Sequence, residues 1–231
     1  MKSLNPFSLS SIVIFSLVSS VAGCCHSAPV RDTKVTPAPV TSTRSVESKP
    51  VSLFDGKTLG GWKPTDYAGA GMPAVEDGSI VLPVGERLTG VAYTGNVPKM
   101  NYEMSFDAKR VDGTDFFAGV TFPVADSFAS LIVGGWGGTV CGISSIDDED
   151  AAHNATRSFQ RFENNKWYHI RLRVTPGKIE SWIGNEKIID LATTGKKLSL
   201  RLDIEDSKPL GLASFQCTAA IRDIQLKSLE K

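Results

Sequence analysis

The chain has 231 residues with 25 basic and 25 acidic side chains, so its formal net charge at pH 7 is zero. Residues 51–231 carry 20 of the basic and 23 of the acidic side chains. This balance excludes the strongly basic surface on which nucleic-acid binding depends, and we expect no nucleic-acid partner.

Residues 1–23 are predicted to be an export signal. Lys2 precedes an apolar run of about ten residues, shorter than the ~20 that a membrane-crossing helix needs. The small residues of Val21–Gly23 before Cys24 resemble the lipobox of bacterial lipoproteins. That resemblance implies that Cys24 is acylated and anchors an exported protein to the outer membrane or cell surface. The alternative is an ordinary signal peptide cut near Ala22.

Residues 24–50 are predicted to be a disordered tether. They are rich in Pro, Ser and Thr and contain almost nothing large and apolar, so they cannot form a core. Residues 51–231 are long enough to form one domain with a substantial core.

The dominant periodicity of this domain is two, which predicts strands. In Tyr102–Lys109 large and polar residues alternate without a fault, and in Leu198–Glu205 four aliphatic residues alternate with Arg201, Asp203 and Glu205. Strands are predicted, in chain order, at 78–83, 90–94, 102–109, 116–122, 130–133, 167–174, 179–183, 198–205, 211–216 and 224–226. Short strands with Gly, Pro and Asn turns, and no sustained helical stripe, predict an all-β jelly-roll sandwich of two antiparallel sheets.

Two cysteines, Cys141 and Cys217, lie inside the domain. An exported protein can form a disulfide, but both residues lie in apolar stretches where free cysteine behaves as a small hydrophobe. Buried thiols are therefore favoured over a disulfide.

Several landmarks resemble the 3-keto-disaccharide hydrolase-like domain over about residues 51–229. They are Leu53–Trp62, Lys166–Tyr168, Gly211–Gln216 and Ile221–Leu226. The resemblance implies a concanavalin A-like jelly roll related to glycoside hydrolase family sixteen, and a carbohydrate ligand.

The middle of the chain departs from the better-known members and looks like a divergent planctomycete-type subgroup. Asp115–Pro123 stands where those members tend to have an Asn-Ser-Gly motif, and Ser130–Gly138 replaces a strand with acidic or amide side chains. Asp115 and Thr121 of the first segment are candidate ligand contacts.

Trp136 stands among the four glycines of Gly134–Gly138. An indole offers a flat apolar face to a pyranose, and glycines let a ligand approach the backbone. The alternative is a core tryptophan packed over a β-bulge.

The acidic run Asp147–Asp150 has three interpretations. Glycosidases need two carboxyl groups about 5–9.5 Å apart, which makes Asp147, Asp150 and Glu205 candidate acid/base residues. Calcium is satisfied by several oxygens, so Asp147, Asp150 and Asn154 are also candidate calcium ligands. The third interpretation is a solvated loop, because no strand carries the Glu-x-Asp-x-Glu pattern of family sixteen.

His153 and Arg201 complete the candidate ligand contacts, together with Asn154. His153 lies close to the acids and could act as a base, although a lone loop histidine is commonly a surface residue. The resulting hypothesis is a lipoprotein that cleaves a glycosidic or 3-keto-glycosidic linkage. The alternatives are a non-catalytic glycan-binding module and a structural envelope lipoprotein.

Overall fold

A computed structural model describes residues 48–229 of the chain. The predicted signal, the lipidation site Cys24 and nearly all of the tether lie outside the described residues and stay predictions. Within the described part, no helix is long and apolar enough to span a bilayer.

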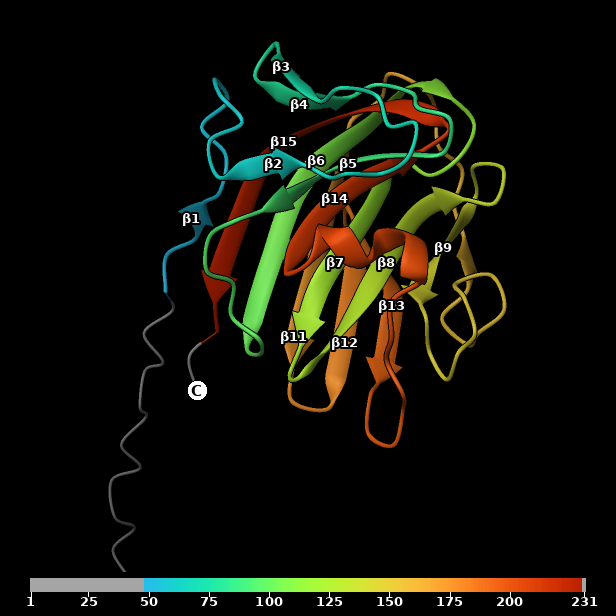
Figure 1. Cartoon of the computed structure of the whole chain (residues 1–231). Coiled ribbons are helices and arrows are strands. Elements are labelled where there is room, and N and C mark those ends of the chain that lie inside the picture. The colour runs from blue at the N-terminus through green and yellow to red at the C-terminus, as the bar shows by residue number, and fades with distance from the viewer. Residues whose placement is uncertain (1–47, 230–231) are drawn as a thin grey trace, which may run out of the picture. The chain divides into compact units, whose positions relative to one another are not determined.

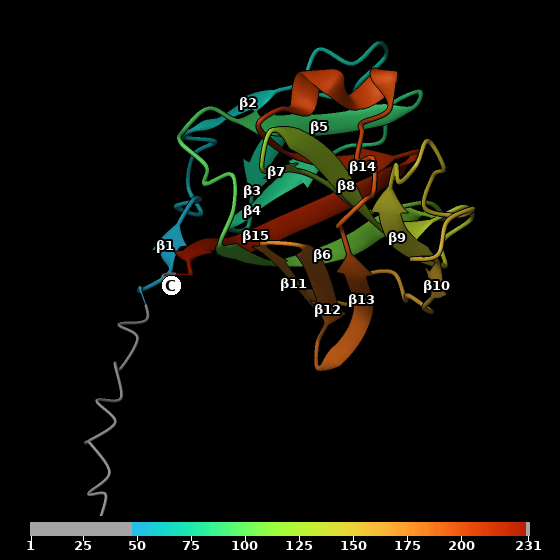
Figure 2. The same ribbon diagram turned by 90° about the horizontal axis from the view of Figure 1, so that it is seen from below.

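The described chain forms two antiparallel sheets packed face to face (Figures 1 and 2). In the first sheet the strand order is β13-β12-β11-β6-β15-β4-β3, with β1 paired to β15. Its strands are β1 (Val51–Ser52), β3 (Ala74–Glu76), β4 (Ser79–Leu82), β6 (Tyr102–Gly113), β11 (Tyr168–Thr175), β12 (Lys178–Ile183), β13 (Glu186–Ala192) and β15 (Cys217–Ser228).

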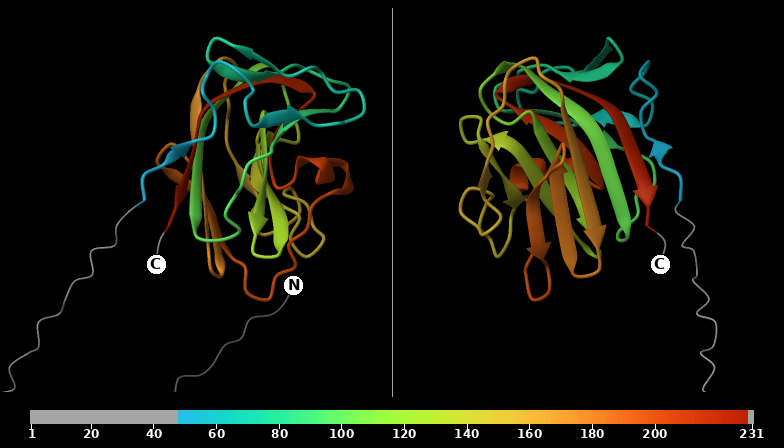
Figure 3. Two further views of the ribbon diagram at one scale, coloured as in Figure 1. Left: turned by 60° about the vertical axis from the view of Figure 1, so that its left-hand side comes forward. Right: turned by 180° about the vertical axis from the view of Figure 1, so that it is seen from behind.

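The second sheet has the order β10-β9-β8-β7-β14-β5-β2. Its strands are β2 (Trp62–Pro64), β5 (Leu88–Tyr93), β7 (Ala118–Val124), β8 (Ser127–Gly135), β9 (Val140–Ser144), β10 (Ser158–Phe159) and β14 (Leu210–Phe215). The predicted all-β jelly roll of two antiparallel sheets is therefore confirmed. In the rear view of Figure 3 the first sheet faces the viewer, and the second lies behind it.

The core fills the space between the two sheets. Alternate residues of β6, namely Tyr102, Met104 and Phe106, are fully buried, as the sequence pattern predicted. Val120 and Phe122 of β7 are buried in the same core cluster. Each such side chain contributes about 1.5–3 kcal/mol by leaving water. The Tyr102 hydroxyl also donates to the Pro123 carbonyl oxygen at 2.7 Å, which ties β6 to β7 across the core.

The strand predicted at 198–205 is wrong. Leu202–Ser207 forms a short 3-10 helix, η1, and Leu202 is 92% exposed. Both sides of the following strand β14 are already paired, with β5 and β7, so this segment cannot form a hairpin with β14. The segment instead crosses the outer face of the second sheet, where the Ser207 hydroxyl donates to Thr121 Oγ1 at 2.7 Å (Figure 2).

Cys141 and Cys217 are both buried and free, so the prediction of buried thiols is confirmed. Burial raises the pKa of each thiol to about 12.

We predict that these two thiols resist alkylation in the folded protein. With pKa values near 12, roughly one thiol in 10⁴ is ionised at pH 8, and only the thiolate reacts. The test uses the full chain with Cys24→Ser and Cys25→Ser, so that Cys141 and Cys217 are its only thiols. Mass spectrometry should detect labelling by iodoacetamide only after the protein is unfolded in guanidinium chloride. Equal labelling rates in native and denaturing buffer would contradict the buried positions.

Candidate functional site

The glycine-rich segment forms the turn between β8 and β9. Gly138 and Thr139 donate their backbone N–H groups to the Gly135 carbonyl oxygen, and the strand register shifts between Val133 and Gly135. Trp136 has a φ of 50°. This left-handed conformation costs an L-residue about 1 kcal/mol, so the turn holds the indole at an energetic cost.

Packing explains two of the glycines. A Cβ atom at Gly138 would lie 2.6 Å from the Thr114 carbonyl oxygen, and one at Gly134 would lie 3.0 Å from the Phe117 ring. Both positions also have positive φ. The missing side chains at these two positions therefore accommodate the protein's own backbone and core, whereas the sequence had suggested room for a ligand.

Asp115 fixes the turn in place. Its carboxylate accepts hydrogen bonds from the backbone N–H groups of Phe116 at 2.7 Å and Gly137 at 3.0 Å. The backbone carbonyl of Asp115 accepts from the guanidinium of Arg110, at 3.3 Å. Asp115 is thus the link between the end of the long strand β6 and the turn that carries Trp136.

Arg110 is buried, with only 6% of its surface exposed to solvent. Besides Asp115, it donates to the side-chain oxygen of Asn164 at 2.6 Å and to the Phe162 carbonyl at 3.1 Å. Its guanidinium carbon lies 5.8 Å from the centre of the Phe117 ring. Neutral oxygens and an aromatic face thus compensate the desolvation of this charge.

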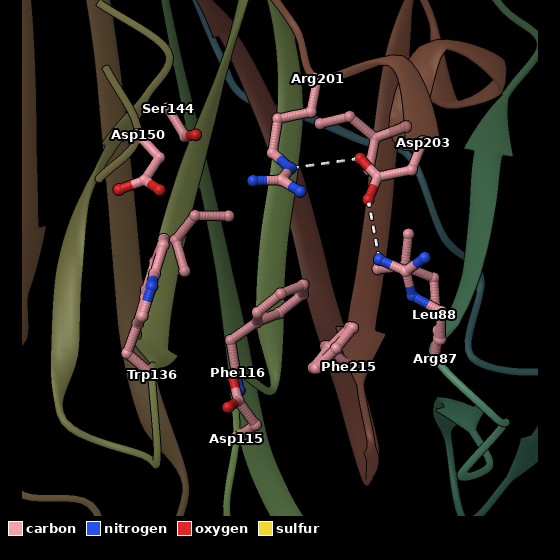
Figure 4. A pocket seen from close by; sticks show the side chains of 12 residues that line it. Arg87, Leu88, Asp115, Phe116, Trp136, Ser144, Asp150, Arg201, Asp203 and Phe215 are labelled. Carbon is pink, nitrogen blue, oxygen red and sulfur yellow. Dashed lines mark hydrogen bonds and ion pairs between the residues drawn. The ribbon is translucent and has the colours of Figure 1, made fainter. Parts of the chain in front are cut away.

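A cavity of about 230 Å³ opens on the outer face of the second sheet (Figure 4). Its apolar lining is Leu88, Phe116, Ile132, Trp136, Ile204 and Phe215. Its polar lining is Arg87, Asp115, Ser144, Asp150, Arg201 and Asp203. We call this cavity the primary pocket.

The primary pocket has an aromatic side and a charged side. The rings of Phe116 and Phe215 are stacked with their centres 5.7 Å apart, and Figure 4 shows them on the side opposite Arg201 and Asp203. Trp136 is 43% exposed and lines the pocket below Asp150 in that view. Flat apolar surfaces facing a few polar groups are what recognition of an amphipathic small molecule requires.

Asp150 and His153 form a hydrogen-bonded pair at the pocket. Asp150 Oδ1 accepts from the Ala152 backbone N–H at 2.9 Å and lies 2.7 Å from Nδ1 of His153. The Asp150 side chain is 23% exposed and that of His153 is 70% exposed. A histidine that donates through Nδ1 keeps Nε2 available for a proton or a ligand.

Asp203 lies between two arginines. Its carboxylate is 3.5 Å from Arg87 Nη2 and 3.3 Å from Arg201 Nε. These contacts are long and partly exposed, so each stabilises the fold by less than about 1 kcal/mol. Both guanidinium groups can therefore exchange Asp203 for a ligand at little cost.

Asp147 does not line the pocket. Asp147 and Asp148 both have positive φ, and Ile146 and Glu149 exchange backbone hydrogen bonds around them, as in a two-residue turn. The Asp147 carboxylate binds the Lys196 ammonium at 2.8 Å and the Lys197 backbone N–H at 2.9 Å. The hydrogen bond from Lys196 is the largest of the effects that lower the pKa of Asp147.

Four further predicted site residues also lie outside the pocket lining, and one of them is His153, which reaches the pocket only through its contact with Asp150. Asn154 is buried, donates to the carbonyls of Ile143, Glu149 and Asp150, and accepts from Thr156 through its side-chain oxygen. Thr121 is buried beneath η1, and Glu205 pairs with Lys208.

The calcium interpretation finds no support in this geometry. Asp147 is engaged by lysines, and the side-chain oxygen of Asn154 is occupied by Thr156. Among residues 48–229, no group of three or more His, Cys, Asp and Glu side chains could hold a metal ion.

Sequence reasoning missed the aromatic pair and Arg87. Phe116 and Phe117 are adjacent at the start of a predicted strand, so one of them had to point away from the core, and Phe117 is the buried one. On β14, Leu212 points into the core, and Phe215 is three residues later, so alternation places the Phe215 side chain on the outer face of the sheet. Arg87 precedes β5 in a loop and has no comparable sequence signal.

The fold defines a jelly-roll β-sandwich protein with a pocket on the outer face of one sheet. Residues 49–227 match the 3-keto-alpha-glucoside-1,2-lyase-like domain, and the chain belongs to this family. No curated protein matches the chain.

Several solved structures share this fold. A Crh5 transglycosylase in complex with NAG is 11% identical, with a TM-score of 0.56 over 81% of this chain and 86% of that chain. An endo-acting O-glycanase from the human gut microbiota is 13% identical, with a TM-score of 0.52 over 79% and 99%. SCLam, a non-specific endo-beta-1,3(4)-glucanase from family GH16, is 10% identical, with a TM-score of 0.50 over 80% and 88%. At these identities the likeness shows the fold alone.

We predict that Asp115→Ala destabilises the protein by about 1–3 kcal/mol, because it removes two hydrogen bonds to a carboxylate and leaves the Phe116 and Gly137 N–H groups without that partner. The measurement is chemical denaturation followed by circular dichroism. Asp112→Ala, at an exposed aspartate near the end of β6, is the matched control and should stay within about 0.5 kcal/mol of wild type. Equal losses of stability from the two substitutions would contradict the conclusion that Asp115 fixes the turn in place.

Proposed function

We propose that the primary pocket binds a sugar ring and that the protein cleaves the glycosidic bond of a 3-keto-glucoside. The observation that carries this proposal is the opposition of aromatic and charged groups in one cavity on the sheet face. The family to which the chain belongs supplies the 3-keto-glucoside as the substrate class.

A pyranose ring suits the two sides of the pocket. Its C–H faces are apolar and pack against aromatic rings, here Trp136 and the stacked pair of Phe116 and Phe215. Its hydroxyl groups bind carboxylate and guanidinium groups, here Asp150 and Arg201. This arrangement orients the ring relative to the charged side.

A ketone at C3 makes bond cleavage possible without a pair of glycosidase carboxylates. It acidifies the hydrogen on C2, so a base can remove that proton while the C2–H electrons form the C1=C2 double bond. The C1–O bond then breaks, and the departing oxygen takes up a proton. The products are the aglycone alcohol and an unsaturated 3-keto sugar. Asp150 and His153 are the groups that we assign to proton removal.

A non-catalytic glycan-binding module is the second candidate. The Asp115 carboxylate already accepts two backbone N–H groups, and that of Asp203 contacts two arginines. Among the described residues, Asp150 is thus the only carboxylate in the pocket lining with an oxygen that has no hydrogen-bond or ion-pair partner. This shortage of free carboxylates favours binding over acid/base hydrolysis, but it leaves elimination open.

The reaction predicts a spectroscopic signal. Elimination creates a conjugated enone, which absorbs in the near ultraviolet, whereas simple hydrolysis does not. Wild-type protein mixed with methyl 3-keto-α-glucoside should show this absorbance, and Asp150→Asn should lower kcat by about 10²-fold or more. Binding of the sugar without any product would favour the glycan-binding module, and release of a 3-keto sugar without the enone would replace elimination with hydrolysis.

We predict that Trp136→Ala weakens sugar binding about tenfold or more, because the truncated side chain no longer covers an apolar face of the ring. Isothermal titration with the 3-keto-glucoside measures the change, with Asp150→Asn present in every protein compared so that turnover is slow. Phe159→Ala is the matched control: Phe159 is a 65% exposed aromatic residue on β10, outside the pocket lining, and its loss should leave the affinity unchanged. A Trp136 variant with wild-type affinity would remove this residue from the site.

A further inference from the structure

A second cavity, of about 250 Å³, adjoins the primary pocket. The two cavities share Arg87, Leu88 and Asp203. Figure 4 shows these three residues together on the side of the primary pocket away from Trp136. The second cavity therefore extends the primary pocket past the Arg87–Asp203 ion pair.

The lining of the second cavity holds hydrogen-bonding groups that the fold does not use. Asp66 and Asp206 are exposed, and their carboxylates have no hydrogen bond or ion pair within the described chain. Tyr67 is only 9% exposed, and its hydroxyl lies near those of Thr65 and Ser207 without reaching hydrogen-bond geometry with either. A buried hydroxyl without a partner costs about 1–3 kcal/mol, so the fold keeps Tyr67 at this cavity at an energetic cost.

Leu202 adds an apolar surface beside these acceptors. It is 92% exposed at the start of η1 and lines the second cavity. Contact with the C–H face of a ring would remove this side chain from water and contribute on the order of 1 kcal/mol. The second cavity thus combines apolar and polar groups, as the primary pocket does.

The charge of the second cavity restricts the ligand further. Three carboxylates, those of Asp66, Asp203 and Asp206, face one guanidinium, that of Arg87. Carboxylates accept hydrogen bonds from hydroxyl and ammonium groups and repel other carboxylates. The cavity is therefore complementary to a ring rich in donors and unfavourable for an acidic ring.

We propose that the second cavity is an aglycone subsite that takes a second sugar ring, preferring a basic amino sugar to a neutral one and a neutral one to a uronic acid. This assignment rests on the proposed function, with the 3-keto ring in the primary pocket. The glycosidic oxygen then points from the primary pocket towards Arg87 and Asp203, and the second ring lies past them. Their 3.5 Å ion pair is partly exposed and weak, so it can rearrange around the second ring.

The test compares four 3-keto-α-glucosides that differ only in the aglycone: methyl, glucosyl, glucosaminyl and glucuronyl. For the full wild-type chain, kcat/KM should be about tenfold higher with the glucosyl than with the methyl aglycone. It should be highest with the glucosaminyl aglycone, and the glucuronyl compound should fall below the glucosyl one. One such hydrogen bond to a charged group corresponds to roughly a tenfold change in kcat/KM.

The double variant Asp66→Asn/Asp206→Asn should reduce the glucosaminyl-to-glucuronyl ratio of kcat/KM by about tenfold or more. Leu202→Ser should lower the glucosyl-to-methyl ratio. Asp126→Asn is the control for a lost surface charge: Asp126 is 98% exposed, pairs with Lys99 and lines neither cavity, so both ratios should stay at their wild-type values. Circular dichroism establishes that each variant is folded.

The possible failures are distinguishable. Turnover of all four compounds with equal kcat/KM, or ratios unaffected by both sets of substitutions, would overturn the aglycone subsite alone. Absence of turnover and of binding for every compound, the methyl glycoside included, would overturn the proposed function and this assignment with it.

Discussion

The buried guanidinium of Arg110 is the constraint on which the site depends. It lies at the end of β6, and its hydrogen bonds reach Asn164, Phe162 and Asp115. A buried charge without partners would cost several kcal/mol, so these loops must stay where their oxygens meet the guanidinium. The Asp115 carboxylate then fixes the β8–β9 turn, and the turn presents Trp136. Gly138 is glycine for the same reason, because a Cβ atom there would lie 2.9 Å from Nη1 of Arg110.

The two-sheet architecture supplies the surface on which this turn acts. Residues alternate along each strand, so filling the core with one set leaves the other set on the outer face. On the second sheet that outer set includes Ile132, Ser144 and Phe215. The segment Arg201–Ser207 closes one side by crossing this face, held by the hydroxyl pair of Ser207 and Thr121. The primary pocket is thus bounded by a glycine-rich turn, a sheet face and a short helix that are distant in sequence.

Five aspartates show how residues of one type can have different roles. Asp147 and Asp148 form a tight turn and pair with lysines. The Asp115 carboxylate accepts backbone N–H groups of the turn, and the Asp203 carboxylate forms ion pairs with two arginines at the boundary between the cavities. Asp150 keeps one oxygen towards the pocket beside His153. These differences come from neighbouring groups that are as far as 116 residues away along the chain, so no local pattern distinguishes the five residues.

The sequence by itself determined the all-β class, the core face of the regular strands and the buried thiols, because alternation of apolar side chains is a local property that any sheet must obey. It also singled out Trp136, Asp150 and Arg201, since a tryptophan among glycines, a run of acids and charged residues on one face of an alternating segment are visible without a structure. Only the tertiary structure decided that 202–207 is helical, because both sides of the next strand, β14, are paired with β5 and β7 and leave no side of β14 for this segment. It alone brought Phe116, Phe215 and Arg87 to the pocket, and it placed Asp147, Asn154 and Glu205 elsewhere, because hydrogen bonds and ion pairs across the fold settle which polar groups are occupied.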